Sequence, residues 1–107
     1  MLAAHDILRT CFSGDAAEPR QVVAALELCI ASDLTPVCDL RDKLTSDAHA
    51  RLRADAAADI AVPFVLSHAL LLRTRIYRLP ADELVLLVTA HHIVADGLCV
   101  GLIRDAL

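Results

Sequence analysis

The chain has 107 residues, of which 57% are hydrophobic and 22% are charged. This composition excludes a disordered or fibrous protein and predicts one small globular domain, or part of one. The formal net charge of -4 offers no basic surface for nucleic acid or anionic lipid. The longest apolar runs, such as Leu84–Ala90, are far shorter than the roughly 20 residues that span a bilayer. We therefore expect neither nucleic acid nor membrane as a partner.

The four cysteines stand at wide, irregular spacings: Cys11, Cys29, Cys38 and Cys99. Without a CxxC pair they form neither a redox motif nor the ligand spacing of a zinc site. No basic segment followed by an apolar one is found after Met1, so no secretory signal is visible. We expect reduced thiols, a cytoplasmic location and no bound metal.

The first third of the chain mixes short elements. Residues Met1–Leu8 are typical of the last turns of a helix, and Arg9–Ser13 of an extended segment, so the chain is expected to open within an element. Gly14 and the aspartate after it predict a turn. The segment Gln21–Ile30 mixes β-branched residues with Ala and Leu, and we interpret it as a strand.

A short extended segment is expected at Pro36–Leu40, followed by a helix that Thr45 or Ser46 caps and that continues through Ala61, before Pro63. Apolar residues recur in it at intervals of four and predict a buried stripe: Ala48, Leu52, Ala56 and Ile60. Charged residues on a neighbouring face predict a solvated surface: Asp47, Arg51, Asp55 and Asp59.

Two strand-like runs, Ala69–Leu79 and Glu83–His92, are joined by the turn Pro80-Ala81-Asp82 and predict a hairpin. The second run is apolar at consecutive positions from Leu84 to Ala90, which is typical of a strand buried on both faces. We expect an interior strand covered by helices. A helical pattern resumes over Leu98–Leu107.

Two histidines follow this apolar strand directly. Polar groups at the end of a buried strand are costly unless they are paired, and neighbouring strand residues point to opposite faces. His91 and His92 therefore cannot both enter one pocket. An imidazole can accept and return a proton near neutral pH. Asp96 follows across a turn that Gly97 permits, and its carboxylate could hold an arginine or bond a backbone amide.

Three stretches resemble motifs of one enzyme family. Residues His91–Gly97 match HHxxxDG, the signature of nonribosomal peptide synthetase condensation domains and of chloramphenicol acetyltransferase-like acyltransferases. Residues His5–Phe12 resemble RHExLRTxF, with Ala4 in place of the first arginine and Asp6 in place of the glutamate. Residues Pro63–Arg75 resemble PFDLSxGPLLRxRL.

In this last stretch Val65 replaces the aspartate, and Ala69-Leu70 replaces the Gly-Pro step. The three motifs occur in order, and the resemblance covers essentially the whole chain. Residues 1–107 are therefore identified as a partial condensation domain, its N-terminal lobe truncated at both ends.

The resemblance implies an α/β fold: one lobe of a two-lobed chloramphenicol acetyltransferase-like fold, with a mixed sheet and packed helices. It also implies that the parent enzyme forms peptide bonds between aminoacyl or peptidyl thioesters held on carrier proteins. The substrates are then carried on phosphopantetheine, and the domain needs no cofactor of its own. The partners expected are the carrier domains and the C-terminal lobe of the same fold.

By the same resemblance His92 is the catalytic residue that faces the substrate tunnel, where it would orient or deprotonate the amine or stabilise the tetrahedral intermediate, and His91 packs on the opposite side. Gly97 keeps the loop tight and could present its amide to an oxyanion. Asp96 is expected to be structural and to pair with an arginine, for which Arg9 and Arg73 are the candidates. The family's first arginine is replaced here by Ala4, so that position cannot supply the arginine partner of Asp96.

Two alternatives stay open. One is an ester-forming HHxxxDG acyltransferase of the wax-ester, polyketide-associated or chloramphenicol type. The other is a truncated, non-catalytic remnant. The motif at Leu8–Phe12 favours peptide synthesis over ester formation. In either case the isolated chain is expected to be inactive, because half of the substrate tunnel is absent.

Overall fold

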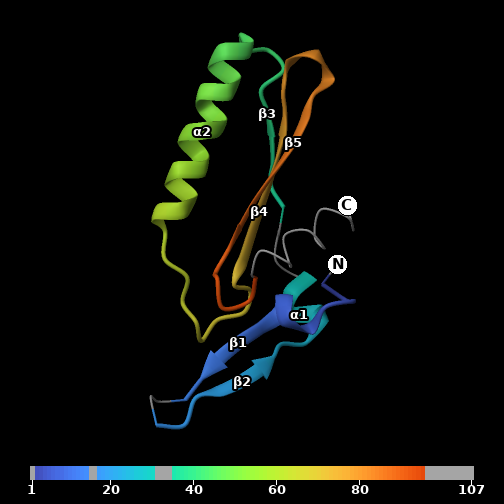
Figure 1. Cartoon of the computed structure of the whole chain (residues 1–107). Coiled ribbons are helices and arrows are strands. Elements are labelled where there is room, and N and C mark those ends of the chain that lie inside the picture. Colours follow the sequence, from blue (N-terminus) through green and yellow to red (C-terminus); the bar gives the residue numbers. More distant parts are fainter. Residues whose placement is uncertain (1, 15–16, 31–34, 96–107) are drawn as a thin grey trace. The chain divides into compact units, whose positions relative to one another are not determined.

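The computed structural model describes residues 2–14, 17–30 and 35–95 (Figure 1). The chain forms two compact units, and each draws on separate parts of the sequence. The first contains Met1–Ser32, Phe64–Leu72 and Ala90–Leu107, and the second contains Asp33–Pro63 and Arg73–Thr89. The helical pattern expected at Leu98–Leu107 lies outside the described residues.

The first unit holds a two-stranded antiparallel sheet. A 3-10 helix, η1 (Asp6–Arg9), leads into β1 (Thr10–Ser13), which pairs with β2 (Arg20–Val23) so that Thr10 lies opposite Val23. Gly14 follows β1 with φ of +100°, where an added Cβ would lie 2.2 Å from the carbonyl oxygen of Glu18. This turn therefore requires glycine.

The extended segment predicted at Arg9–Ser13 is confirmed as β1. The single strand predicted at Gln21–Ile30 is wrong, because β2 ends at Val23 and the helix α1 (Leu26–Ile30) begins three residues later. The β-branched pair at the start of the segment favours a strand, whereas the Ala, Leu and Glu that follow are helix formers. When propensities are averaged over the whole segment, the change from strand formers to helix formers is hidden.

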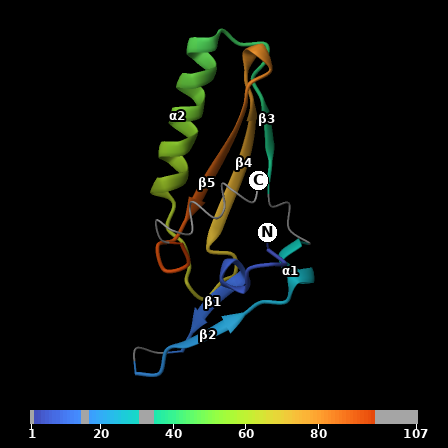
Figure 2. The same cartoon turned by 45° about the vertical axis from the view of Figure 1, so that its right-hand side comes forward.

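The second unit contains a mixed sheet covered by one long helix (Figures 1 and 2). The strand order is β3 (Val37–Asp39), β4 (Leu72–Arg78) and β5 (Leu84–Ala90). Strand β3 runs parallel to β4, and β5 runs back along β4 after the short 3-10 turn η2 (Pro80–Asp82) (Figure 1). The predicted hairpin is confirmed.

The core of the second unit lies between this sheet and α2 (Thr45–Ala61). Four side chains are buried there: Leu40, Ala48, Tyr77 and Leu79. Cys38, Leu52, Val85 and Leu87 pack against them. Full burial of a large apolar side chain contributes roughly 1.5–3 kcal/mol, so these few contacts carry much of the unit's stability.

Helix α2 begins at Thr45 and ends at Ala61, close to the predicted bounds. Leu44 occupies the N-cap position without a side-chain hydrogen bond, so the predicted capping by Thr45 or Ser46 is wrong. The helix ends because Val62 precedes a proline and takes an extended conformation, with φ of -82° and ψ of 117°.

The prediction of a solvated charged face on α2 is wrong for two of its members. The side chains of Asp55 and Asp59 are only 14% and 17% exposed, because they face the sheet. The hydroxyl of Tyr77 donates to Asp55 Oδ2 at 2.9 Å, and Thr89 Oγ1 donates to Asp59 Oδ2 at 3.3 Å. Arg75 forms ion pairs with both carboxylates at 3.4 and 3.7 Å.

This polar contact shifts the ionisation of its members. Burial opposes the charged form of Asp55, but the hydrogen bonds from Arg51 and Tyr77 outweigh it and lower the pKa of the carboxyl. Burial, together with the bond to Asp55, raises the pKa of Tyr77.

The apolar stripe predicted on α2 is wrong at its last member, because Ile60 is 74% exposed.

The interior position expected for Leu84–Ala90 is wrong within the described residues, where β5 pairs with β4 alone and forms an edge of the sheet. Leu84 is 69% exposed, whereas the rest of the strand is half-buried. A continuous apolar run shows that both faces avoid water, but it does not reveal which strands lie beside it.

Candidate active site

The candidate site begins where β5 ends. The backbone N–H of His91 donates to the carbonyl of Leu71 at 2.9 Å and so extends the pairing of the hairpin by one bond. The chain then turns, and the N–H of Val94 donates to the carbonyl of His91 at 3.0 Å. Val94 is only 2% exposed, so its side chain anchors the far side of the turn.

His91 is half-buried and held on two sides. Its ring meets that of Phe64 edge to face, with centroids 6.1 Å apart and planes at 87°. Its Nδ1 accepts a hydrogen bond from the backbone N–H of Ile93 at 3.1 Å. An accepting Nδ1 carries no proton, so this geometry fits the neutral ring.

The side chain of His92 is exposed, one residue further along the turn. The two histidines therefore differ in surroundings, as expected of neighbours at a strand end. Asp96 and Gly97 lie outside the described residues. The roles assigned to all four motif residues stay predictions.

The first arginine candidate, Arg9, ends η1 and already has several partners. Its Nε donates to the carbonyl of Leu2 at 3.3 Å, and its Nη1 to the carbonyl of Ala24 at 2.7 Å. Its Nη2 forms an ion pair with Asp6. Arg9 thus ties η1 to the chain just after β2, beside the buried Thr10, whose hydroxyl donates to the Asp6 carbonyl at 2.8 Å.

The second candidate, Arg73, lies on β4. Its Nη2 donates to the carbonyls of Asp59 and Val62, at 2.8 and 2.7 Å. These carbonyls stand at the C-terminus of α2, where backbone acceptors lack partners within the helix. Arg73 therefore caps α2, and its pairing with Asp96 stays a prediction.

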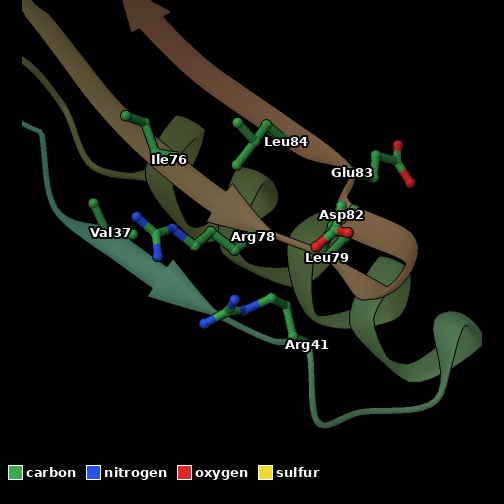
Figure 3. A pocket seen from close by; sticks show the side chains of 8 residues that line it. All are labelled: Val37, Arg41, Ile76, Arg78, Leu79, Asp82, Glu83 and Leu84. Atoms are coloured by element: carbon green, nitrogen blue, oxygen red, sulfur yellow. The ribbon is translucent and has the colours of Figure 1, made fainter.

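A pocket of about 400 Å³ lies between β3, β4 and the start of β5 (Figure 3). Apolar side chains from the three strands line it: Val37, Ile76 and Leu84. Arg41 and Arg78 add two cations. No sequence pattern predicts this pocket, because its lining comes from separate segments of the chain.

Arg41 in this pocket is already engaged. Its Nε and Nη2 donate to the two carboxylate oxygens of Asp39 at distances from 2.6 to 3.1 Å. The hydrogen bonds from Arg41 lower the pKa of Asp39 to about 2. The lining also contains the carboxylates of Asp82 and Glu83 but no histidine, so the imidazoles of the sequence motif lie outside this pocket, on the turn at His91 and His92.

In the described part of the chain no three His, Cys, Asp or Glu side chains come together in a way that could hold a metal ion. Within the same residues no helix is both long and apolar enough to cross a membrane.

Comparison with known proteins identifies one family. The model of the condensation domain matches residues 1–107. Phosphinothricin tripeptide synthetase PhsC of Streptomyces viridochromogenes is 41% identical over 106 residues, which cover 96% of this chain and 9% of that protein. Malpibaldin synthetase of Mortierella alpina is 36% identical over 108 residues, which cover 98% of this chain and 2% of that protein.

Solved structures show the same fold. The starter condensation domain of the rhizomide synthetase RzmA matches with a TM-score of 0.80 and 22% identity, over 96% of this chain and 23% of that one. A second structure, which describes condensation domain-mediated chain release from the enacyloxin polyketide synthase, matches with a TM-score of 0.75 and 26% identity. The match covers 97% of this chain and 20% of that one. The chain thus spans about a quarter or less of the structures it matches.

Proposed function

The chain belongs to the condensation-domain family, and on that premise we propose that it supplies the catalytic histidine of a domain that forms peptide bonds between carrier-bound thioesters. The family match covers residues 1–107, and the relatives named above include peptide synthetases. The matching structures support the expected chloramphenicol acetyltransferase-like α/β fold, with a mixed sheet and a packed helix.

One observation carries the proposal. At the end of β5 the first histidine is held by Phe64 and by the N–H of Ile93, while the side chain of His92 is exposed on the turn. The exposed imidazole of His92 stands on a fixed turn with its side chain open to a substrate, whereas Nδ1 of His91 is taken up by the Ile93 amide and its ring is packed on Phe64. His92 is therefore the residue to which we assign the chemistry.

In the proposed reaction the amine of the acceptor attacks the thioester carbonyl of the donor. A C–N bond forms, the C–S bond breaks, and the thiol of the donor's phosphopantetheine arm leaves. His92 orients the amine and accepts its surplus proton, which is then available to the departing thiolate. A well-placed general base contributes roughly 10²–10⁴-fold in rate.

The remaining motif residues take supporting roles in this proposal. Asp96 braces the loop through an arginine, with Arg9 and Arg73 as the candidates, and Gly97 keeps the loop tight. The partners are carrier domains and the second lobe of the fold. From the order of its motifs we assign the chain to the N-terminal lobe, and the match covers only 23% of a solved condensation domain, so the rest of the tunnel is expected from other parts of the fold.

The product of a complete condensation domain carrying this segment tests the proposal. A donor and an aminoacyl acceptor are loaded on their carriers, and the product is identified by mass spectrometry. The matched control is an acceptor whose amino group is replaced by a hydroxyl. We expect the amide from the first acceptor and little ester from the second. Ester formation at an equal or higher rate would show an ester-forming acyltransferase instead.

A further inference from the structure

His91 is joined to the turn through both its backbone and its side chain. Its N–H bonds the carbonyl of Leu71 at 2.9 Å, and its own carbonyl accepts the N–H of Val94 at 3.0 Å. Its Nδ1 accepts the N–H of Ile93 at 3.1 Å. One residue thus fixes the end of β5 and the two backbone amides that follow His92.

The bond from the Ile93 amide to Nδ1 resembles the one that asparagine and aspartate make in tight turns. Those residues accept the N–H two positions further on with a side-chain oxygen bonded to Cγ. The Nδ1 atom of histidine is bonded to Cγ as well, so it occupies an equivalent place. The imidazole performs this task only while Nδ1 is unprotonated.

Phe64 determines which way the ring of His91 faces. The two rings meet at 87° with centroids 6.1 Å apart, an edge-to-face arrangement that aromatic rings favour. A rotation of the imidazole about its Cβ–Cγ bond would carry Nδ1 away from the Ile93 amide. The contact with Phe64 opposes that rotation.

We propose that His91 is a positioning residue whose Nδ1 closes the turn that presents His92, and that Phe64 keeps the ring in the orientation this requires. The inference rests on the proposed catalytic role of His92. Closing the turn is a different role for His91 from packing alone. If His91 only filled space, another aromatic ring would replace it, whereas a residue that closes the turn needs an acceptor at the δ position.

Two substitutions in a complete condensation domain separate these roles. His91→Asn keeps an acceptor at the δ position and loses the ring, and His91→Phe keeps a ring and loses the acceptor. We expect His91→Asn to retain the single-turnover rate within about 5-fold. His91→Phe should lose roughly 10-fold to 10²-fold in that rate with little change in acceptor KM, because small displacements of a reacting group are costly. The exposed His68 supplies the control, His68→Asn.

Two further measurements examine the turn without any activity assay. The ¹⁵N spectrum of the unmodified domain should show Nδ1 of His91 unprotonated and Nε2 protonated. Hydrogen exchange of the Ile93 amide should stay slow in His91→Asn and become faster in His91→Phe and in Phe64→Leu. If His91→Phe does not fold, the ¹⁵N spectrum and the Phe64→Leu and His91→Asn variants still give the answer.

A proton on Nδ1, equal protection of Ile93 in all variants, or a His91→Phe enzyme faster than His91→Asn would overturn the inference. The spectrum and the exchange rates decide on the turn even if the activity assays show that His92 is not catalytic. Failure of the turn and failure of the proposed function are thereby distinguished.

Discussion

Neighbouring residues of one type acquire different chemistry from their surroundings. His91 and His92 are adjacent, yet the first is half-buried against Phe64 and the second is exposed. The alternation of side chains along a strand predicts that they diverge. It does not predict what each one meets, because Phe64 lies 27 positions earlier in the chain than His91. The motif therefore predicted the candidate site, and the contacts of His91 became visible only in the fold.

A double-mutant cycle can assign the arginine partner of Asp96. In a complete condensation domain, Asp96→Ala is combined with Arg9→Ala and, separately, with Arg73→Ala. We expect a coupling energy between about 0.5 and 3 kcal/mol for the true partner and additivity within about 0.5 kcal/mol for the other. The measurement is the free energy of unfolding in denaturant. Additivity in both cycles would contradict a brace between Asp96 and either arginine.

At the scale of elements, periodicity succeeded where one face of an element is uniformly apolar or where a breaker marks its end. It gave the bounds of α2, which Pro63 terminates, and the hairpin around Pro80. It did not predict which side chains of α2 are buried, because alanine is abundant in the helix and the apolar stripe is hardly more hydrophobic than the neighbouring faces. Asp55 and Asp59 face the sheet because β4 offers them Arg75 and Tyr77, and the helix sequence alone does not contain that information.

The polar contact between α2 and β4 predicts how the free energy of unfolding changes at acid pH. The pKa of Asp55 is lowered in the folded protein, so its contribution is fully present above the unfolded value of about 3.9 and is lost as the pH falls through the folded value. Asp55→Asn should lower the free energy of unfolding by about 1–2 kcal/mol at pH 7, since Tyr77 keeps an acceptor but the arginines lose a charge. The deficit should shrink below about pH 4.

Urea denaturation of the complete domain between pH 7 and pH 3 measures this deficit. Asp42→Asn is the control, because the Asp42 side chain is 75% exposed and lies beside Lys43. It should follow the unmodified protein at every pH. A constant deficit for Asp55→Asn over the whole range would show that the loss does not arise from the ionised carboxylate.

At the scale of the whole molecule, the chain spans only a small part of the proteins and structures that it matches. The match to a solved condensation domain includes 96% of this chain but only 23% of that domain's chain. The order of the three sequence motifs sufficed to predict the family and the mixed sheet. The edge position of β5 was not predictable, because an apolar run does not name its neighbours.

We expect the 107-residue chain alone to form no peptide bond. Catalysis by positioning requires both substrates to be held in one closed site, and this chain covers only 23% of a matching condensation domain. The assay combines the purified chain with loaded donor and acceptor carriers and measures dipeptide by mass spectrometry. The complete domain is the positive control. Dipeptide above the rate without protein would contradict the prediction.

The most direct test of the account is the single-turnover rate of His92→Ala in a complete condensation domain, measured together with its thermal unfolding. If His92 handles the proton of the attacking amine, the rate should fall by roughly 10²-fold or more. The melting temperature should hardly change, because the side chain is exposed on its turn. His68→Ala, at another exposed histidine, should keep the normal rate. A His92→Ala protein that forms peptide at the normal rate would contradict the catalytic role of His92.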